Sequence, residues 1–430
     1  MEAVDASSIR DGVGVGGVRR PGRHRSPVKA LDRLHRWWRG GASAGSFPYR
    51  PVLGHFQAVG RNHADPGLVA TLRAARDVLP AGHDDARALV LRQWLPSTVD
   101  QEDGDYDTYA GVSLLNLLAD SYGSGEVVDD TLDALQVVLL ADLLRYETSA
   151  LVEEPDLLRQ QVRVKACLRA LARADELAPR ARGLVPANPL GDNAIRDLGR
   201  DDLLARGAEL SRAVRSVAPP AMRDAVEFAM LPTTWLHDEV MFIRSIQSFE
   251  VVYRQVARCL ERATAALDAG RPAAASDELR DATRRITATS MLYRILTSMP
   301  PDAFAIIRAY THGRSAVQSR SFRLVEQYSA PPPPDTAGIE LPGPSLQEVY
   351  EARLATAGPA SLGYLTETMR GLDSAWRLMK RTHWGITLKV IGRVPGTGGT
   401  AGAAYLEQAA ARPLFPVLHP RQDDWRDRIA

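Results

Sequence analysis

Two long apolar stripes in the second half of this 430-residue chain constrain its fold more than any other feature. Within each stripe the apolar residues recur at intervals that alternate between four and three, which places them all on one face of a helix. The first stripe comprises Phe242, Ile246, Phe249, Tyr253, Val256, Leu260, Ala263 and Leu267, and the second comprises Leu365, Met369, Leu372, Trp376, Met379, His383, Ile386 and Val390. Strand-like alternation is scarce along the whole chain, so the sequence predicts an all-α fold with helices over about 236–267 and 360–392.

Shifts in composition divide the chain into three expected regions. Residues 1–45 are rich in Gly, Ser and Arg with little apolar periodicity, which predicts a disordered basic tail. Residues 46–218 show helical patterning, and a pair of prolines then opens a third region over 219–430. In this third region a helix is expected over 276–299, and the Pro-rich residues 329–345 are expected to form a linker or lid.

Overall composition excludes several classes of protein. The 53 basic and 52 acidic residues give a net charge of +1, which argues against a nucleic-acid partner. The two cysteines, Cys167 and Cys259, are too few for a disulfide scaffold or a four-cysteine metal site. The sequence has neither an apolar run long enough to span a membrane nor a secretory signal, so we expect no membrane partner and a cytoplasmic location.

His383 is the only titratable residue on the second stripe. A neutral imidazole needs one partner for its lone pair and another for its N–H. An iron ion would satisfy the lone pair, and Gly385 would leave room for a flat macrocycle nearby. A core histidine satisfied by neighbouring protein groups produces the same pattern, so the stripe alone leaves both interpretations open.

Two further features suit a carboxylate. The glycine-rich loop 396–402 precedes a short helical segment, and such a loop lets backbone N–H groups approach a small anion. It lacks the Lys-Ser/Thr pair of a nucleotide-binding P-loop. Arg308 ends an apolar segment, and its guanidinium is shaped for bidentate carboxylate binding. A flexible connector and a structural arginine are the alternative interpretations.

Three blocks of the second half occur in an order that is typical of a known family. They are His237-Asp238-Glu239-Val240-Met241-Phe242-Ile243 with Gln247-Ser248-Phe249-Glu250; Phe304, Arg308-Ala309-Tyr310, Ser315, Gln318-Ser319 and Phe322-Arg323; and Trp376, His383, Ile391-Gly392, Gly396-Thr397-Gly398-Gly399-Thr400, Gly402, Tyr405-Leu406 and Phe415-Pro416. Together, over about 230–420, they resemble the tryptophan 2,3-dioxygenase superfamily of haem-dependent aromatic oxygenases. The resemblance implies a helical-bundle haem domain, here preceded by a second helical region.

The resemblance also implies a role for each matching residue. His383 aligns with the proximal haem ligand, and Arg308 with the arginine that binds the substrate carboxylate. Thr397, beside Gly398 in the glycine loop, aligns with a threonine that contacts the amino-acid part of the substrate. The remaining matches are Phe242 and Phe304, which align with walls of the pocket, and Ser315, which aligns with a serine near the haem.

Two departures from the family pattern lie on the expected distal side of the haem. The distal histidine of the family aligns with Ile246, and a distal-side tyrosine aligns with Phe249, so no catalytic side chain is assigned. The related indoleamine dioxygenases also lack the histidine, and the change therefore does not exclude dioxygenation. It does put L-tryptophan in doubt as the substrate, because an indole N–H has no evident acceptor at Ile246.

The expected function is that of an enzyme containing haem b that uses O2 on an aromatic amino acid. The first hypothesis is a tryptophan 2,3-dioxygenase-like reaction, which cleaves the indole ring of L-tryptophan or a derivative and belongs to tryptophan catabolism. The alternatives are a haem mono-oxygenase that hydroxylates a tryptophan or tyrosine derivative in secondary metabolism, a non-catalytic haem-binding protein, and a helical interaction protein that has lost haem. The resemblance further implies a homodimer or homotetramer.

Overall fold

The computed structural model describes residues 27–78, 85–100, 105–123, 125–153, 158–186, 191–311, 318–332, 339–392 and 402–419. Every regular element within these ranges is an α-helix or a short 3₁₀ turn, which confirms the all-α prediction. In the same ranges, no helix has both the length and the apolar character needed to cross a membrane.

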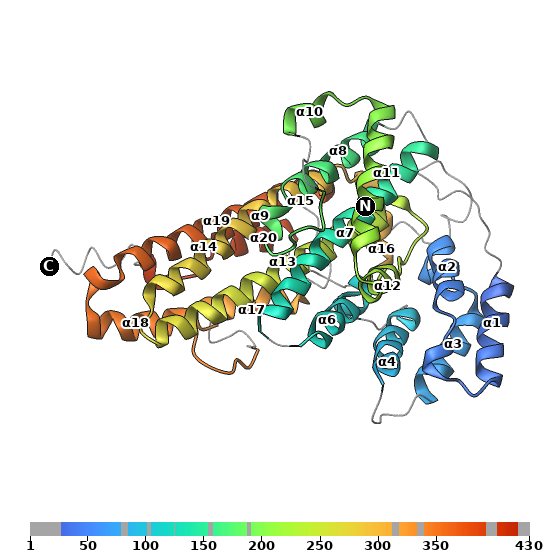
Figure 1. Ribbon diagram of the computed structural model, residues 1–430, viewed down its shortest axis with the longest axis horizontal. Coiled ribbons are helices and arrows are strands. Elements are labelled where there is room, and N and C mark those ends of the chain that lie inside the picture. The colour runs from blue at the N-terminus through green and yellow to red at the C-terminus, as the bar shows by residue number, and fades with distance from the viewer. Residues whose placement is uncertain are drawn as a thin grey trace.

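The first half of the chain folds into helices of very different lengths (Figure 1). They are α1 (Pro27–Arg39), η2 (Ala44–Ser46), α2 (Tyr49–Val59), η3 (Arg61–His63), α3 (Pro66–Val78), α4 (Ala86–Val99), α5 (Tyr106–Ala110), α6 (Val112–Ser121), α7 (Glu126–Glu153), α8 (Leu158–Ala172), α9 (Ala174–Leu177), α10 (Asp192–Asp197), α11 (Arg200–Val217) and α12 (Pro220–Phe228). Helix α1 lies within the stretch expected to be a disordered tail. It is ordered because Leu34 and Trp37 fall on one face and are buried, whereas residues 1–26 lie outside the described residues.

The second half is built around three long helices that lie alongside one another (Figure 1). Its elements are α13 (His237–Asp268), α14 (Pro272–Ala288), α15 (Ser290–Leu296), α16 (Pro301–Tyr310), α17 (Arg320–Ser329), α18 (Leu346–Ala357), α19 (Pro359–Ile391), α20 (Ala403–Ala411) and η6 (Pro416–Leu418). Helices α13 and α19 match the two helices predicted from the apolar stripes to within about one residue at each end.

The helix expected over 276–299 is instead two helices, α14 and α15, which meet at Thr289. The Thr289 hydroxyl donates a hydrogen bond to the carbonyl oxygen of Ile286 at 2.6 Å, and its backbone N–H donates to the same oxygen at 3.1 Å. These bonds, which span three residues, interrupt the regular ladder at that turn and divide the segment into two helices. Among the expected linker residues 329–345, those that the structure describes after α17 and before α18 form no further helix.

One hydrophobic core runs through both halves of the chain. It includes Leu34 and Trp94 from the first half and Trp376 and Phe415 from the second, so its packing continues across residues 218 and 219. The apolar stripe of α19 faces this core, since Leu365, Met369, Leu372 and Trp376 are at most 1% exposed. Burial of such a stripe is the main free-energy reason for a long helix to dock.

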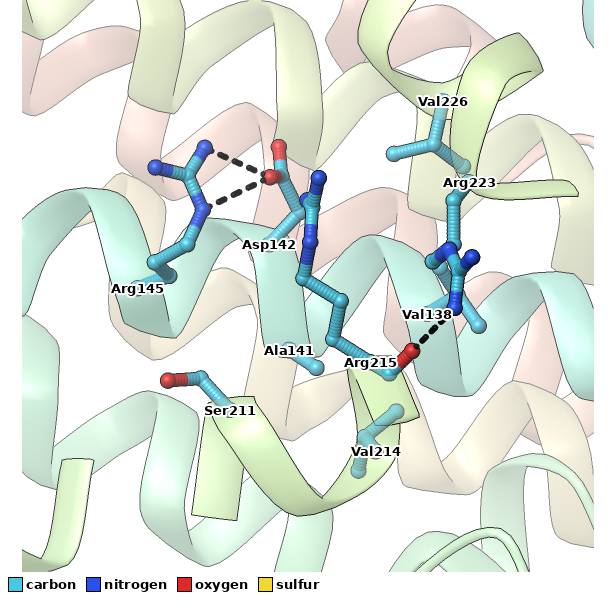
Figure 2. A pocket seen from close by; sticks show the side chains of 9 residues that line it. All are labelled: Val138, Ala141, Asp142, Arg145, Ser211, Val214, Arg215, Arg223 and Val226. Atoms are coloured by element: carbon cyan, nitrogen blue, oxygen red, sulfur yellow. Dashed lines mark hydrogen bonds and ion pairs between the residues drawn. The ribbon is translucent and has the colours of Figure 1, made fainter. Parts of the chain in front are cut away.

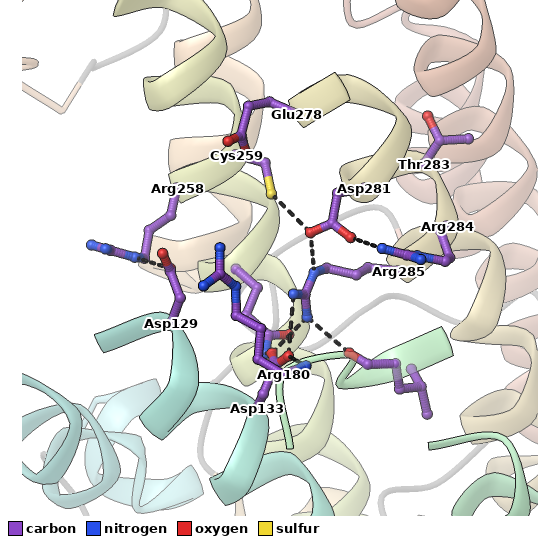
Figure 3. A network of polar contacts seen from close by, with 12 residues as sticks. Asp129, Asp133, Arg180, Arg258, Cys259, Glu278, Asp281, Thr283, Arg284 and Arg285 are labelled. Carbon is purple, nitrogen blue, oxygen red and sulfur yellow. Dashed lines mark hydrogen bonds and ion pairs between the residues drawn. The ribbon is translucent and has the colours of Figure 1, made fainter. Parts of the chain in front are cut away.

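Buried ion pairs also join the two halves. Arg285 of α14 donates to Asp133 of α7 at 2.7 Å and to the Leu177 carbonyl at 2.9 Å (Figure 3). Arg244 of α13 donates to Asp142 of α7 at 2.6 Å and 2.9 Å. In each pair the two charges come from different halves, so removal of either partner would cost the other the counter-charge that joins the halves.

Candidate functional site

Helix α19 holds His383 with its imidazole beside an aromatic ring. The ring is only partly buried, and it stacks beside Tyr293 of α15 with 6.2 Å between ring centroids. Neither ring nitrogen forms a hydrogen bond to another described residue. Burial among apolar groups lowers the pKa of His383 to about 4, so its imidazole is neutral at neutral pH.

These residues fit a haem group. A neutral imidazole with an unused lone pair is the donor that a haem iron takes as its axial ligand. A Cβ atom added at Gly385, two residues further on, would meet nothing within 4 Å, so the helix surface there is open. The described residues contain no cluster of three His, Cys, Asp or Glu side chains suited to a bare metal ion, whereas a porphyrin iron requires only one protein donor.

An aromatic layer connects α19 to α13. Tyr293 lies between the two helices, with its ring 4.6 Å from that of Phe249 and its hydroxyl donating to the sulfur of Met379 at 3.2 Å. Tyr253 lies 5.6 Å from Trp376, measured between ring centroids. Through Tyr293, the layer links Phe249, an expected site residue, to His383. Tyr293 was missed by the sequence analysis because it lies on a helix with no family motif.

Helix α16 brings two more of the expected site residues to the same bundle. Phe304 meets Phe242 of α13 edge to face, with 5.4 Å between ring centroids, so the two expected pocket walls are in contact. Arg308 follows Phe304 by four residues, which places it on the same side of α16, and it is half-buried. Helix α16 also packs against α19. The bundle therefore gathers Phe242, Phe304 and Arg308 on helices that pack together.

Three of the expected site residues lie outside the described residues: Ser315, Thr397 and Gly398. Their expected roles stay predictions. Ser315 follows α16 in the chain, and the glycine loop follows α19.

The face of α13 that carries Ile246 is covered by the first half of the chain. Ile246 packs against a small cluster formed by Tyr106, Ala110 and Val112 at the junction of α5 and α6. The side-chain amide of Gln247 donates to the Ala110 carbonyl at 2.7 Å, which fixes α5 against α13. Sequence patterns did not reveal this contact, because it joins residues more than a hundred positions apart.

Glu250 lies one helical turn beyond Ile246 and is 6% exposed. The Tyr106 hydroxyl donates to its carboxylate at 2.8 Å, and the hydroxyls of Ser319 and Ser321 also hydrogen-bond to it. Burial raises the pKa of Glu250 to about 7 despite these hydrogen bonds, which lower it. A buried carboxyl with a pKa near neutrality is unusual. The sequence analysis included Glu250 in a family motif but assigned it no role.

A surface crevice between α7, α11 and α12 contains none of the expected site residues (Figure 2). Arginines line much of it, but most are already paired. Arg145 donates to Asp142 at 2.8 Å and 3.2 Å, and Arg223 donates to the Arg215 carbonyl at 2.9 Å. Their charges and donors are therefore largely used within the protein, and we assign no ligand to this crevice.

The fold and the imidazole define the class as an all-α protein with a histidine suited to haem, and the relatives of the chain are consistent with that class. No family model matches the sequence. The chain is similar to tryptophan 2,3-dioxygenases from Anaeromyxobacter dehalogenans (27% identical, 45% of this chain and 90% of that protein), Bradyrhizobium diazoefficiens (27%, 48% and 88%) and a Polaromonas species (23%, 47% and 85%). The similarity supports a divergent relationship to the tryptophan 2,3-dioxygenases, and about half of the chain lies outside it.

Proposed function

We propose that the chain is a haem-dependent oxygenase that uses O2 on an aromatic amino acid. The observation that carries this proposal is the neutral, unpaired imidazole of His383 on an otherwise apolar helix face. The similarity to tryptophan 2,3-dioxygenases supports the reaction type, and cleavage of the indole ring of L-tryptophan or a derivative is the first candidate.

Each residue of the proposed site has a distinct task. His383 would hold the iron of haem b, and the haem would supply the chemistry of O2. Arg308 binds the substrate carboxylate, while Phe242 and Phe304 contact its aromatic ring. Fixing both ends of the substrate supplies orientation, which lowers a large part of the activation barrier. Thr397 and Gly398 would contact the amino-acid part of the substrate, and Ser315 would lie near the haem.

Mono-oxygenation of a tryptophan or tyrosine derivative is the second candidate. The observation that favours it is the apolar pair Ile246 and Phe249, since neither side chain accepts a hydrogen bond from an indole N–H. A haem carrier without turnover is less consistent with Arg308, because a carrier has no use for an arginine that binds a substrate carboxylate. The proposal includes assembly as a homodimer or homotetramer, which light scattering on the purified protein would test.

Mass spectrometry of reaction products separates the two candidates. The haem-loaded protein would be incubated with tryptophan, tyrosine and their methylated derivatives under air and under ¹⁸O-labelled O2. A gain of two labelled oxygen atoms indicates ring cleavage, and a gain of one indicates mono-oxygenation. If no substrate gains oxygen and none perturbs the Soret band, the proposed function is wrong.

A further inference from the structure

Three segments that are distant in the sequence meet around Glu250. The residue belongs to α13, its partner Tyr106 belongs to α5, and Ser319 and Ser321 lie at the start of α17. Glu250 is four residues after Ile246, so both side chains lie on the side of α13 that α5 covers. The position that replaces the family's distal histidine therefore has a buried carboxyl one helical turn away.

Glu250 differs from Glu147, a buried carboxylate on the neighbouring helix α7. Glu147 is paired with His237 at 3.0 Å and with Arg163 at 3.5 Å. Glu250 forms no salt bridge within the described part of the chain, and all three of its hydrogen-bond partners are neutral hydroxyls. Without a cation beside it, its charge is compensated only by dipoles, so its protonated form is favoured.

The other charged groups nearby do not change this conclusion. Asp107 of α5 raises the pKa of Glu250 further, while Arg320 and Arg323 of α17 act on Asp107 itself. On α13 the nearest titratable group is Tyr253, whose pKa burial raises well above its usual value. Burial and Glu250 likewise raise the pKa of Tyr106, which keeps its proton and remains a donor. Glu250 is thus the group in this cluster that exchanges a proton near neutral pH.

We infer that Glu250 and Tyr106 form a buried proton-holding pair that serves the Ile246 side of the oxygenase site. The inference rests on the function proposed above. Neither Ile246 nor Phe249 can hold a proton, whereas Glu250, one helical turn beyond Ile246, carries a carboxyl that can. In this role Glu250 is a positioning residue: it hydrogen-bonds to Tyr106 and keeps a proton available at its carboxyl, and it need not touch the substrate.

The test compares Glu250→Gln and Tyr106→Phe with a matched control on the same helix. Glu261→Gln is the control. Glu261 lies on α13 about three turns beyond Glu250, is exposed, and also hydrogen-bonds to a tyrosine, Tyr328 of α17. Infrared difference spectra across a pH titration report the carbonyl stretch of protonated carboxyl groups. Wild type and Glu261→Gln should show a band that titrates near pH 7, and Glu250→Gln should lack it. Tyr106→Phe should shift that titration to higher pH, because a bond that stabilises the charged form is lost.

Turnover provides the second readout. In Glu250→Gln the rate should fall by about 100-fold and lose its dependence on pH near neutrality, as expected when a proton-holding group is removed. Substrate affinity, measured from the Soret shift, should change less than about twofold in the same variant. A wild-type protein without the infrared band, or a Glu250→Gln variant with wild-type turnover and pH profile, would overturn the inference. Failure of the proposed function would give a different result: the infrared band would be present, but the wild-type protein would convert no aromatic amino acid. Glu250 and Tyr106 would then have no oxygenase site to serve.

Discussion

At the scale of single residues, the proposed chemistry depends on side chains whose polar atoms are not used by neighbouring protein groups. His383 has an apolar helix face around it and an aromatic ring beside it, so its lone pair has no competing use within the described residues. His419 provides the contrast: its Nε2 lies 2.9 Å from the carboxylate of Asp373 and is already partnered. Burial without a partner is what makes an imidazole a candidate ligand.

Replacing His383 by Ala should abolish stoichiometric haem binding. The imidazole is the only donor that we assign to the iron, so its loss removes the axial bond and leaves weak apolar contacts. Titration of the purified variant with haem, followed at the Soret band, measures the effect. His419→Ala should bind haem as the wild type does. A normal five-coordinate spectrum in His383→Ala would show that another residue is the ligand.

Replacing Arg308 by Ala should weaken substrate binding by about 30-fold or more while leaving haem binding intact. This factor corresponds to about 2 kcal/mol, a typical free energy for a hydrogen-bonded charge pair. The dissociation constant comes from the Soret change on addition of an aromatic amino acid. Arg294→Ala, an exposed arginine on the adjacent helix α15, is the control and should bind normally. Equal affinities in the two variants would place Arg308 outside the site.

Glu250 makes folding stability depend on pH. Its pKa rises from an ordinary 4.5 in the unfolded chain to about 7 in the folded protein. The folded state therefore holds the proton more tightly, and this stabilisation is present below about pH 4.5 and is lost as pH rises through about 7. Compared with Glu250→Gln, wild type should lose about 3 kcal/mol of unfolding free energy between pH 4 and pH 8. Urea unfolding at both pH values measures this, and parallel changes in the two proteins would contradict it.

At the scale of elements, the sequence predicts those helices that are long enough to show a regular apolar periodicity. The alternating apolar positions were enough to locate α13 and α19. The break at Thr289 was missed, since it depends on one hydroxyl bonding back to the helix. The docking of α5 onto α13 was missed as well, because a five-residue helix has no periodicity to read and its contacts are distant in sequence. His383 was found from its own helix, whereas Tyr293 and Tyr106 required the tertiary structure.

The approach of α5 to the site depends on Gly111, which joins α5 to α6. Its φ is +68°, and a Cβ atom there would lie 2.3 Å from the Ala229 carbonyl oxygen. Gly111→Ala should therefore lower the unfolding free energy by at least about 3 kcal/mol, from backbone strain and this clash together. Gly270→Ala is the control, because its φ is +72° but its Cβ would meet nothing within 4 Å, and it should cost about 1 kcal/mol. Similar losses in the two variants, measured by urea unfolding, would show that the contact at Ala229 is not tight.

At the scale of the whole molecule, the first half of the chain is part of the same folded unit as the second half. Buried arginines and aspartates from opposite halves are paired at several places, and the hydrophobic core is continuous between them. Charged pairs of this kind contribute little net stability compared with apolar packing, but they penalise any arrangement that separates the partners. Helices α13 and α14 of the second half are therefore held in position partly by their ion pairs with α7 and α8 of the first half.

Asp133 provides the sharpest test of this dependence. It is fully buried on α7, where it accepts hydrogen bonds from Arg285 and from the backbone N–H of Arg180 (Figure 3). Asp133→Ala should lower the unfolding free energy by about 3 kcal/mol, because buried Arg285 would lose its counter-charge on α7 and keep only Asp281 of its own helix. Asp277→Ala breaks an exposed pair with Arg280 on the same helix as Arg285, and its unfolding free energy should match that of the wild type. Chemical denaturation monitored by circular dichroism compares the two. If Asp133→Ala were as stable as Asp277→Ala, the Asp133–Arg285 pair would not help to hold α14 against α7.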